Sequence, residues 1–240
     1  MSIKPHAFVA MPFGTKPGPD GAPVDFNRVY EELIRPALDD AGLFAFRADE
    51  EMRGGDIRVD MFQELLIADL VVVDLTIDNP NVWYELGVRH ALRARGVVLI
   101  SGGRATKAFD VYTDRKVSYA LRDGGPDPDS LADDRHRLTE MIAKTMESWH
   151  GRKMSPVYKL IPSLVEPDWR SLRVGDLRDW HVLRVRCERC KHEGSVYPSR
   201  LRARAHESTR LVDLAARFRC QHCKASGQVS WAVFRSAGTS

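Results

Sequence analysis

Apolar runs of strand length alternate with amphipathic segments of helical length over residues 6–101, and this pattern restricts the fold more than any other feature of the chain. The apolar runs are HAFVAM, LFAFRAD, LVVVDLT and GVVLIS. Near-continuous apolar strands separated by helices are typical of a parallel sheet covered on both faces. The sequence therefore predicts an α/β domain, of which a flavodoxin-like doubly wound sheet is the most economical form.

Cap and turn residues delimit the expected helices. Asp25 is placed to cap the segment DFNRVYEELIRPALDDAG, and Pro36 inside that segment should kink or break it. Asp56 is placed to cap the next helix, and Asn79 followed by Pro80 begins the third. These signals predict one helix after each of the first three strands.

The remaining segments set the domain boundaries. Residues 105–122 fit either a fifth strand or irregular structure, and LADDRHRLTEMIAKTMESW reads as a long amphipathic helix. SPVYKLIPSLVEPDW contains three prolines and suggests an extended linker that wraps the domain. We therefore expect an α/β domain over residues 1–150, a proline-containing linker over 151–172 and a zinc-ribbon domain over 173–240, for the reasons given below.

Charge is distributed unevenly along the chain. From Arg173 onward there are 14 Lys and Arg against 6 Asp and Glu, which leaves 22 against 27 before it, so the formal charges are +8 and −5. Two domains with different partners are the natural inference. No apolar run is long enough to span a bilayer, and the N-terminus has no export-signal pattern, so we expect a cytoplasmic location without membrane contact.

All four cysteines lie in the basic tail as two CxxC pairs, Cys187 with Cys190 and Cys220 with Cys223, separated by 29 residues. In a reducing compartment such pairs read as metal ligands before disulfides. Each pair forms a knuckle that presents two thiolates, and together they complete a tetrahedral zinc site. Because four protein ligands leave no open position, the expected zinc ion is structural.

The residues around the cysteines predict a small zinc ribbon. WHVLRVRC and VSWAVF are strand-like, and an arginine-rich segment between them reads as one or two short helices. His192 and His222 are alternative ligands that a full set of thiolates makes unnecessary. The basic ribbon is predicted to contact nucleic acid or protein, or else to cover the acidic domain or mediate formation of a homo-oligomer.

The loops that follow the four strands should meet at one edge of the sheet, where open α/β sheets bind ligands. At this edge Asn79 and Pro80 place Glu85 in the second turn of a helix, whose positive end should keep the carboxylate ionised. An ionised carboxylate facing a sugar can attack or stabilise an oxocarbenium-like carbon. The alternative is a solvated ion pair with Arg89, four residues later. Gly87 is costly within a helix and suggests that something approaches that face closely.

The combination AFVAMPFG, RADEEMRGGDI and ADLVVVDLTIDNPNVWYELGVRHAL resembles the nucleoside 2-deoxyribosyltransferase-like families. These families belong to a wider group that includes deoxynucleotide N-glycosidases and TIR-like NAD-cleaving domains. The resemblance covers roughly residues 5–122, and its most specific part is the Asp-rich strand end followed by the YELG helix. It implies a nucleoside, nucleotide or NAD-like substrate.

The resemblance also implies roles for individual residues. Glu85 matches the glutamate that acts on C1′, and Asp74 matches the carboxylate that holds ribose hydroxyls or shuttles a proton to the leaving base. The implied substrate contacts are Met11 and Phe13 stacking on the base, Gly14 leaving room for a phosphate, Asp49 and Arg53 at the sugar or phosphate, and Asp78 and Asn81 in the same part as Asp74. In the alternative interpretation, Asp74 only caps the following turn. Met11 and Phe13 would then be packing residues.

Three functions are consistent with these patterns. The first is an enzyme that cleaves or transfers at the N-glycosidic bond, with Glu85 at C1′. The second is a nucleotide sensor that binds the same ligands without turnover. The third is an interaction module in which Glu85 only pairs with Arg89. The base, the acceptor and the oligomeric state are not fixed by the sequence.

Overall fold

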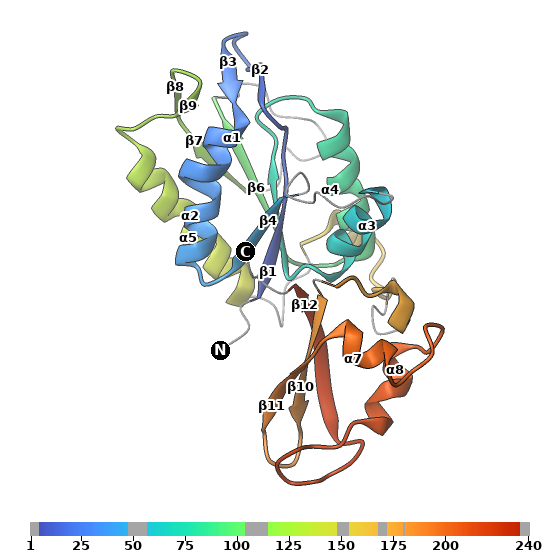
Figure 1. The fold of residues 1–240 in the computed structure, drawn as a ribbon. Coiled ribbons are helices and arrows are strands. Elements are labelled where there is room, and N and C mark those ends of the chain that lie inside the picture. The colour runs from blue at the N-terminus through green and yellow to red at the C-terminus, as the bar shows by residue number, and fades with distance from the viewer. Residues whose placement is uncertain are drawn as a thin grey trace. The chain divides into compact units, whose positions relative to one another are not determined.

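The computed structural model describes residues 5–47, 57–103, 115–147, 154–167, 172–179 and 181–235. The chain divides into two compact units, with the boundary between Glu166 and Pro167. We call residues 5–166 the α/β unit and residues 167–235 the cysteine unit, and Figure 1 shows the elements of each. No helix in the described ranges is long and apolar enough to cross a membrane.

A five-stranded sheet forms the centre of the α/β unit. Its strands, in spatial order, are β4 (Phe44–Arg47), β1 (His6–Ala10), β5 (Leu70–Asp74), β6 (Val97–Gly102) and β7 (Lys116–Tyr119). Every neighbouring pair is parallel. The parallel sheet expected from the apolar runs is confirmed, and β7 shows that residues 116–119 form the fifth strand.

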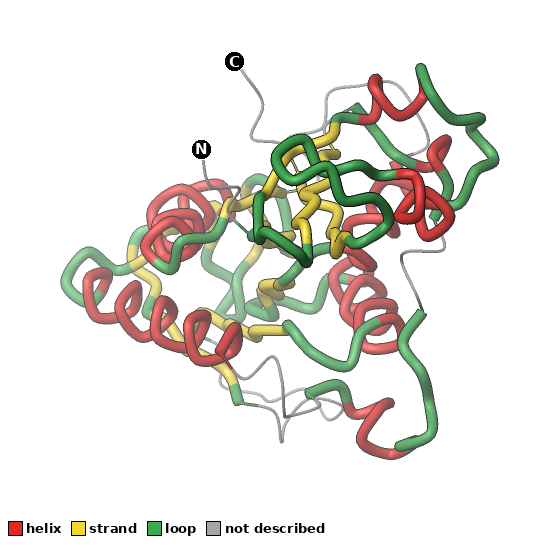
Figure 2. Tube along the Cα trace, turned by 90° about the horizontal axis from the view of Figure 1, so that it is seen from below, coloured by secondary structure: helices red, strands yellow, loops and turns green. Residues whose placement is uncertain are grey.

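Helices cover both faces of this sheet, as Figures 1 and 2 show. One apolar cluster takes Ala7 and Val9 from β1, and the other takes Phe8 and Ala10, so successive side chains of the strand enter opposite cores. The helices of the first core are α1 (Phe26–Val29), η1 (Tyr30–Ile34), α2 (Arg35–Asp40) and α5 (Leu131–Glu147), and those of the second are α3 (Ile57–Ile67) and α4 (Pro80–Leu92).

The first helical segment carries both of the features that its sequence predicts. The Asp25 side chain accepts hydrogen bonds from the backbone N–H groups of Asn27 and Arg28, so it caps α1. The helix then widens into a π-helical turn, η1, immediately before Pro36. A proline ring clashes with the carbonyl four residues earlier in a regular α-helix, and a wider turn relieves that clash. The break that Pro36 predicts is therefore a π-helical segment, and the chain stays helical from α1 through α2.

Two short hairpins extend the loops of the α/β unit. The loop after β1 contains β2 (Thr15–Pro17) paired antiparallel with β3 (Pro23–Asp25). The turn before α5 contains β8 (Leu121–Arg122) paired with β9 (Gly125–Pro126). The loop between β4 and α3, with the expected cap Asp56, lies outside the described residues.

The proline-rich segment after α5 packs on the α/β unit. It contains the short helix α6 (Pro156–Leu160), so the expectation of a wholly extended segment is wrong at these residues. Pro156 occupies the start of that helix, where its missing N–H costs nothing. The Tyr158 hydroxyl donates to the Ala91 carbonyl, and the Ser155 hydroxyl donates to the His90 carbonyl. These bonds attach the segment to the C-terminal end of α4.

The cysteine unit is built on a three-stranded antiparallel sheet. Its strands, in spatial order, are β11 (Glu193–Val196), β10 (His181–Cys187) and β12 (Val229–Arg235). Its short helices are η6 (Val174–Asp176), α7 (Pro198–Arg202), α8 (Leu211–Leu214) and η7 (Ala215–Arg217). The strands expected on either side of the cysteines and the short helices between them are thus present.

Candidate active site and metal centre

The centre of the parallel sheet is the point at which its strand order reverses. The chain places β4 on one side of β1 and then returns to place β5 and β6 on the other side. In open α/β sheets this reversal leaves a crevice outside the carboxyl ends of the strands, and ligands bind there. Helix α4 follows β5 and packs against both β5 and β1. The side chains of its first turns are therefore the first to consider.

Asn79 and Pro80 begin α4 as the sequence predicts. The Asn79 side chain accepts hydrogen bonds from the backbone N–H groups of Asn81 and Val82, and Pro80 occupies the first helical turn. The indole N–H of Trp83 donates to Asp78 at 3.3 Å. The Asp78 and Asn81 side chains are exposed at this helix start, and the substrate contacts implied for them stay a prediction.

Glu85 lies in the second turn of α4 with only 8% of its surface exposed. No hydrogen-bond donor or cation among the described residues contacts its carboxylate. Burial raises the pKa of Glu85 from 4.5 to about 7. The expectation that the helix end keeps it fully ionised is therefore wrong, because desolvation outweighs the helix dipole at this depth. Near neutral pH the group exists in both protonation states.

The predicted ion pair between Glu85 and Arg89 is absent. Arg89 is fully buried, and its guanidinium donates instead to four backbone carbonyls, those of Leu65, Ala68, Arg95 and Gly96. It thus holds the end of α3 to the turn that enters β6. Burial lowers the pKa of Arg89 to about 9, so the group stays charged at neutral pH. An ion pair with Arg89 therefore does not explain the presence of Glu85.

Packing among the described residues does not require a glycine at position 87. A Cβ added at this position would meet no atom within 4 Å, and the residue is exposed. The expectation of a close approach at this face of α4 is therefore wrong for the protein alone.

Asp74 ends β5, and each of its carboxylate oxygens accepts a hydrogen bond from another group of the protein. Its side chain is fully buried, and it accepts hydrogen bonds from the Thr76 backbone N–H and the Tyr119 hydroxyl, each at 2.8 Å. Burial raises the pKa of Asp74, while the bonds from Thr76 and Tyr119 act in the opposite direction. The Thr76 hydroxyl lies 2.8 Å from the Tyr119 hydroxyl and accepts from the Gly102 N–H at 2.7 Å. Asp74 therefore fixes the ends of β5, β6 and β7.

Two of the residues expected to contact a base differ in exposure. Met11 is 2% exposed and belongs to an apolar core, so it packs in the protein and does not face a ligand. Phe13 is 40% exposed, and the Arg47 guanidinium lies 5.4 Å from its ring centroid. Gly14 adopts a φ of 62°, with no atom near the position of a Cβ. This part of the first loop is open, as a phosphate contact would require.

Arg47, Thr76 and Tyr119 were not anticipated from the sequence. Arg47 ends β4, is 7% exposed, and also lies 4.5 Å from the centroid of the Tyr30 ring. A single charged residue at the end of an apolar strand is the one signal that could have indicated it. Asp49 and Arg53, which were expected to contact the sugar or phosphate, lie outside the described residues.

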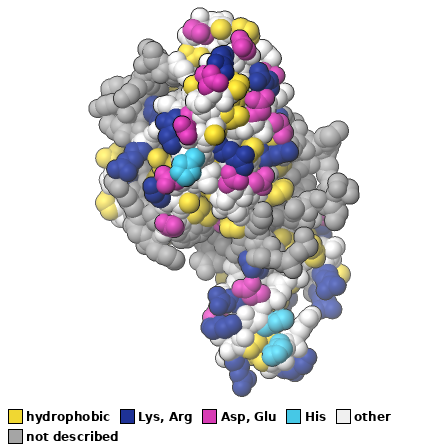
Figure 3. Space-filling view, turned by 90° about the vertical axis from the view of Figure 1, so that its left-hand side faces the viewer, with side chains coloured by type: hydrophobic (Ala, Val, Ile, Leu, Met, Phe, Trp, Pro, Cys, Tyr) yellow, Lys and Arg dark blue, Asp and Glu magenta, His cyan; other side chains and the backbone are white. Residues whose placement is uncertain are grey.

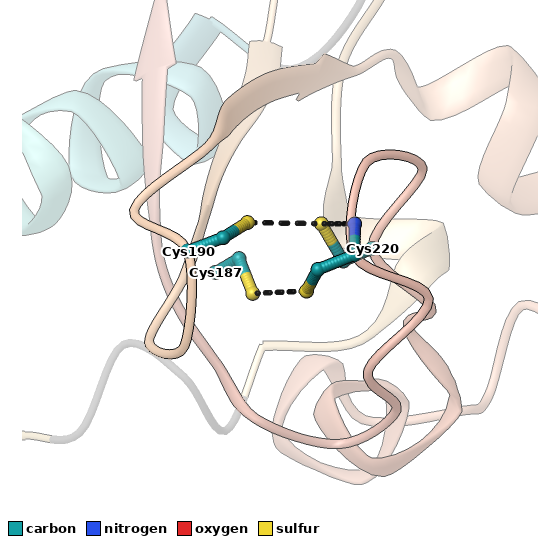
Figure 4. A group of neighbouring side chains, drawn as sticks. Cys187, Cys190 and Cys220 are labelled. Atoms are coloured by element: carbon teal, nitrogen blue, oxygen red, sulfur yellow. Dashed lines mark hydrogen bonds between the residues drawn. The ribbon is translucent and has the colours of Figure 1, made fainter.

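The four cysteine sulfurs of the cysteine unit converge on one point. All four lie within 4.8 Å of one another, and the Cys187–Cys223 and Cys190–Cys220 pairs are each 3.6 Å apart (Figure 4). A disulfide holds its sulfurs about 2.05 Å apart, so these are free thiols. Four ligands at about 2.3 Å from a central zinc lie about 3.8 Å from one another, so this cluster fits a tetrahedral metal ion.

The two knuckles have the same backbone design. The Cys187 N–H donates to the His192 carbonyl, and the Lys191 N–H donates back to the Cys187 carbonyl. The second knuckle repeats both bonds from Cys220, with Lys224 as the returning donor. The two lysines adopt left-handed φ values of 59° and 60°. This repeated turn brings the thiols of each pair to the same side.

Backbone N–H groups favour the thiolate form at two of the four cysteines. The backbone N–H of Cys223 holds the pKa of Cys220 down at about 6, and that of Cys190 lowers the pKa of Cys187. Burial and the other three thiols raise the pKa of Cys190 to about 11. His192 and His222 are exposed and stack on each other with centroids 5.7 Å apart. They lie outside the four-sulfur group, so the cysteines alone can hold a metal ion.

No known family model matches this chain, and no curated protein matches it significantly. The geometry of the two sites is therefore what indicates a function. One is a buried carboxylate with no partner among the described residues, beside the point where the strand order of the parallel sheet reverses. The other is a complete set of four thiols.

Proposed function

We propose that the α/β unit binds a nucleoside, nucleotide or NAD-like molecule at the carboxyl edge of its sheet and cleaves or transfers its N-glycosidic bond. The observation that carries the proposal is the buried carboxylate of Glu85, which has no partner among the described residues and a pKa of about 7, on the helix that packs against β1 and β5. The chain order of the strands, second–first–third–fourth–fifth, supports a flavodoxin-like doubly wound fold. Such folds bind ligands at this edge.

Glu85 is the group that acts on C1′ in this proposal. As the bond from C1′ to the base nitrogen breaks, positive charge develops on the sugar, and the ionised carboxylate stabilises it or forms a bond to C1′. The base leaves with the bonding electrons, and water or the N–H of a second base then takes the sugar and loses a proton. A base that left as an anion gains that proton. A cationic sugar in the site also favours the ionised form of Glu85, which an empty apolar site disfavours.

Asp74 is a positioning residue in this scheme. Both of its oxygens are occupied by Thr76 and Tyr119, so it holds the loop that leads into α4 and does not contact the substrate. Phe13 and Arg47 form the other side of the proposed site. The partly exposed Phe13 ring offers a face for a base, and the guanidinium beneath it supplies positive charge close to a phosphate.

A panel of NAD, NADP, nucleosides and deoxynucleoside monophosphates tests the enzyme, with release of free base followed by chromatography. We expect one class to be cleaved by the native protein and by Glu64→Gln, and not by Glu85→Gln. Glu64 is a matched control because it is equally buried but pairs with His6 at the opposite edge of the sheet. Full turnover by Glu85→Gln would overturn the mechanism.

One observation favours a second candidate, a nucleotide sensor without turnover. Glycosidases of the two-carboxylate type need a second free carboxyl group near the first. Asp74, the carboxylate assigned to that part, is wholly engaged within the protein. A sensor predicts saturable binding of one panel member with no base release, and loss of that binding in Phe13→Ala.

We propose that the metal of the cysteine unit is zinc and that it is structural. Four thiolates complete its coordination and leave no position for a substrate. We expect one zinc ion per chain by elemental analysis of reduced protein, retained in His192→Ala and lost in Cys190→Ser. Iron or no metal in the native protein would contradict the assignment.

A further inference from the structure

A cavity of about 820 Å³ opens on the cysteine unit between its sheet and its short helices. This volume falls within the roughly 300–1,000 Å³ of typical ligand pockets. Four arginines line it, namely Arg200, Arg204, Arg217 and Arg219. Among the described residues of its lining, none is acidic. A concave site with charge of one sign is suited to an anionic ligand.

The lining arginines differ from the other arginines of the unit in their partners. Arg184 pairs with Glu193 at 2.6 Å, and Arg202 pairs with Asp179 at 2.7 Å. Arg210 pairs with Asp213 at 2.9 Å. These three acidic side chains thus form their ion pairs with arginines that do not line the cavity.

Within the described residues, the side chains of Arg200 and Arg204 have no ion pair or hydrogen bond. Arg217 has only a longer-range attraction to Asp213, and Arg219 donates only to the Lys224 carbonyl. All four side chains are exposed, and none donates to a cysteine sulfur. Their guanidinium groups are therefore available to an incoming phosphate, which their planar fork binds in a bidentate way.

The metal site in the cavity wall does not cancel this charge. Cys187 and Cys220 contribute to the lining. Four thiolates and one zinc ion carry a net charge of −2, against +4 from the four arginines. The lining remains cationic with the metal bound. On the face of this unit that Figure 3 shows, dark blue Lys and Arg side chains are more extensive than magenta Asp and Glu side chains.

The cavity also offers rings against which bases can stack. Phe218 lines it with an intermediate exposure, and the exposed His192 ring, already stacked on His222, lines it as well. Bases stack on aromatic side chains when they are not paired in a duplex. The concave shape admits one strand more readily than a double helix, which needs a protruding helix or strand to enter its groove.

We infer that this cavity binds single-stranded nucleic acid, with the four arginines on phosphates and Phe218 and His192 against bases. The inference is independent of the function proposed for the α/β unit. Contacts to four phosphates predict that the logarithm of affinity falls with the logarithm of salt concentration with a slope of about −2.8.

Fluorescence anisotropy of labelled oligo(dT) and oligo(U) 12-mers with the full-length, metal-loaded protein tests the inference. We expect Arg200→Gln with Arg204→Gln to lower affinity at least tenfold and to reduce the salt slope by about 1.4. The control is Arg184→Gln with Arg210→Gln, which removes the same charge from arginines that have acidic partners. We expect it to change affinity less than threefold. Metal content confirms that each variant retains its fold.

A second variant separates stacking from charge. Phe218→Ala leaves all four arginines in place, and we expect it to weaken oligonucleotide binding several-fold with an unchanged salt slope. Equal losses in the two double variants would show non-specific attraction and overturn the site. Absence of oligonucleotide binding would show that the arginines only offset the thiolates. Preference for a duplex, or for polyglutamate at equal charge, would assign the cavity to another partner.

Discussion

The two sites of this protein differ in whether their side chains have bonding partners. The four thiols of the cysteine unit face one another, and a single metal ion would meet the needs of all of them. In the part of the α/β unit that the structure describes, no donor or cation contacts the buried carboxylate of Glu85, and burial raises its pKa to about 7. A satisfied set of ligands is the mark of a structural element, whereas an unsatisfied buried charge costs stability and is retained where chemistry needs it.

Of the changes that test this difference between the two sites, loss of the metal should have the largest effect on stability. Structural zinc contributes about 10–16 kcal/mol of apparent binding free energy at pH 7 in small zinc domains. We expect Cys220→Ser, or a strong chelator, to unfold the cysteine unit while the α/β unit keeps its own melting transition. Limited proteolysis followed by mass spectrometry locates the cleavages. Cleavage distributed equally over both units would show that the site also holds the α/β unit together.

The next effect concerns Arg89, the buried cation one turn after Glu85. Removing it leaves four carbonyls without this donor, so we expect Arg89→Met to lower the free energy of unfolding by about 3 kcal/mol or more. Because Arg89 does not contact Glu85, the effects of Arg89→Met and Glu85→Gln should add within about 0.5 kcal/mol. Denaturant melts of the single and double variants measure both quantities. A larger coupling would restore the ion-pair interpretation.

Glu85→Gln should stabilise the protein at high pH. The folded pKa of about 7 lies above the unfolded value of 4.5, so the folded state binds more protons between these values and loses stability as the pH rises through them. The substitution removes this penalty, and we expect a gain of about 2–3 kcal/mol at pH 8 and less than about 1 kcal/mol at pH 5. Thermal melts at both values check the sign. An equal change at the two values would contradict the burial of an ionisable group.

The smallest effect is that of Gly87. An alanine methyl group at this exposed helical position meets open space, so Gly87→Ala should stabilise the protein by about 1 kcal/mol. If a ligand or partner approaches α4 closely at this face, the same change should weaken its binding. Melting temperature and nucleotide binding measured on one preparation distinguish the two effects. Destabilisation of the protein alone would mean that the backbone at Gly87 is strained.

The sequence predicted elements well where the signal is local. Asn79 with Pro80 and Asp25 are helix starts because each cap bonds to backbone groups two or three residues away. The two CxxC pairs likewise determine their own turns, since both bonds of each knuckle lie within six residues. The alternation of apolar runs and helices was enough to predict the parallel sheet.

What the sequence could not supply is the pairing of distant groups. The spacing of Glu85 and Arg89 suits an ion pair, but the burial of Arg89 directs it to carbonyls 6 to 24 residues away. The Tyr119 hydroxyl reaches Asp74 over 45 residues of chain, which no local pattern encodes. The raised pKa of Glu85 depends on tertiary burial that outweighs its position in the helix. The properties of the candidate site around Glu85 therefore follow from tertiary packing more than from sequence motifs.

The ionisation of Glu85 tests the central claim most directly. Protein labelled with ¹³C at the glutamate carboxyl carbons can be titrated by NMR between pH 4 and 9, with Glu85→Gln to assign the resonance. We expect one carboxyl resonance that titrates near pH 7 in the native protein and is missing from the spectrum of Glu85→Gln. A normal pKa close to 4.5 for Glu85 would show that the carboxylate is solvated, and the case for a buried catalytic group would fail.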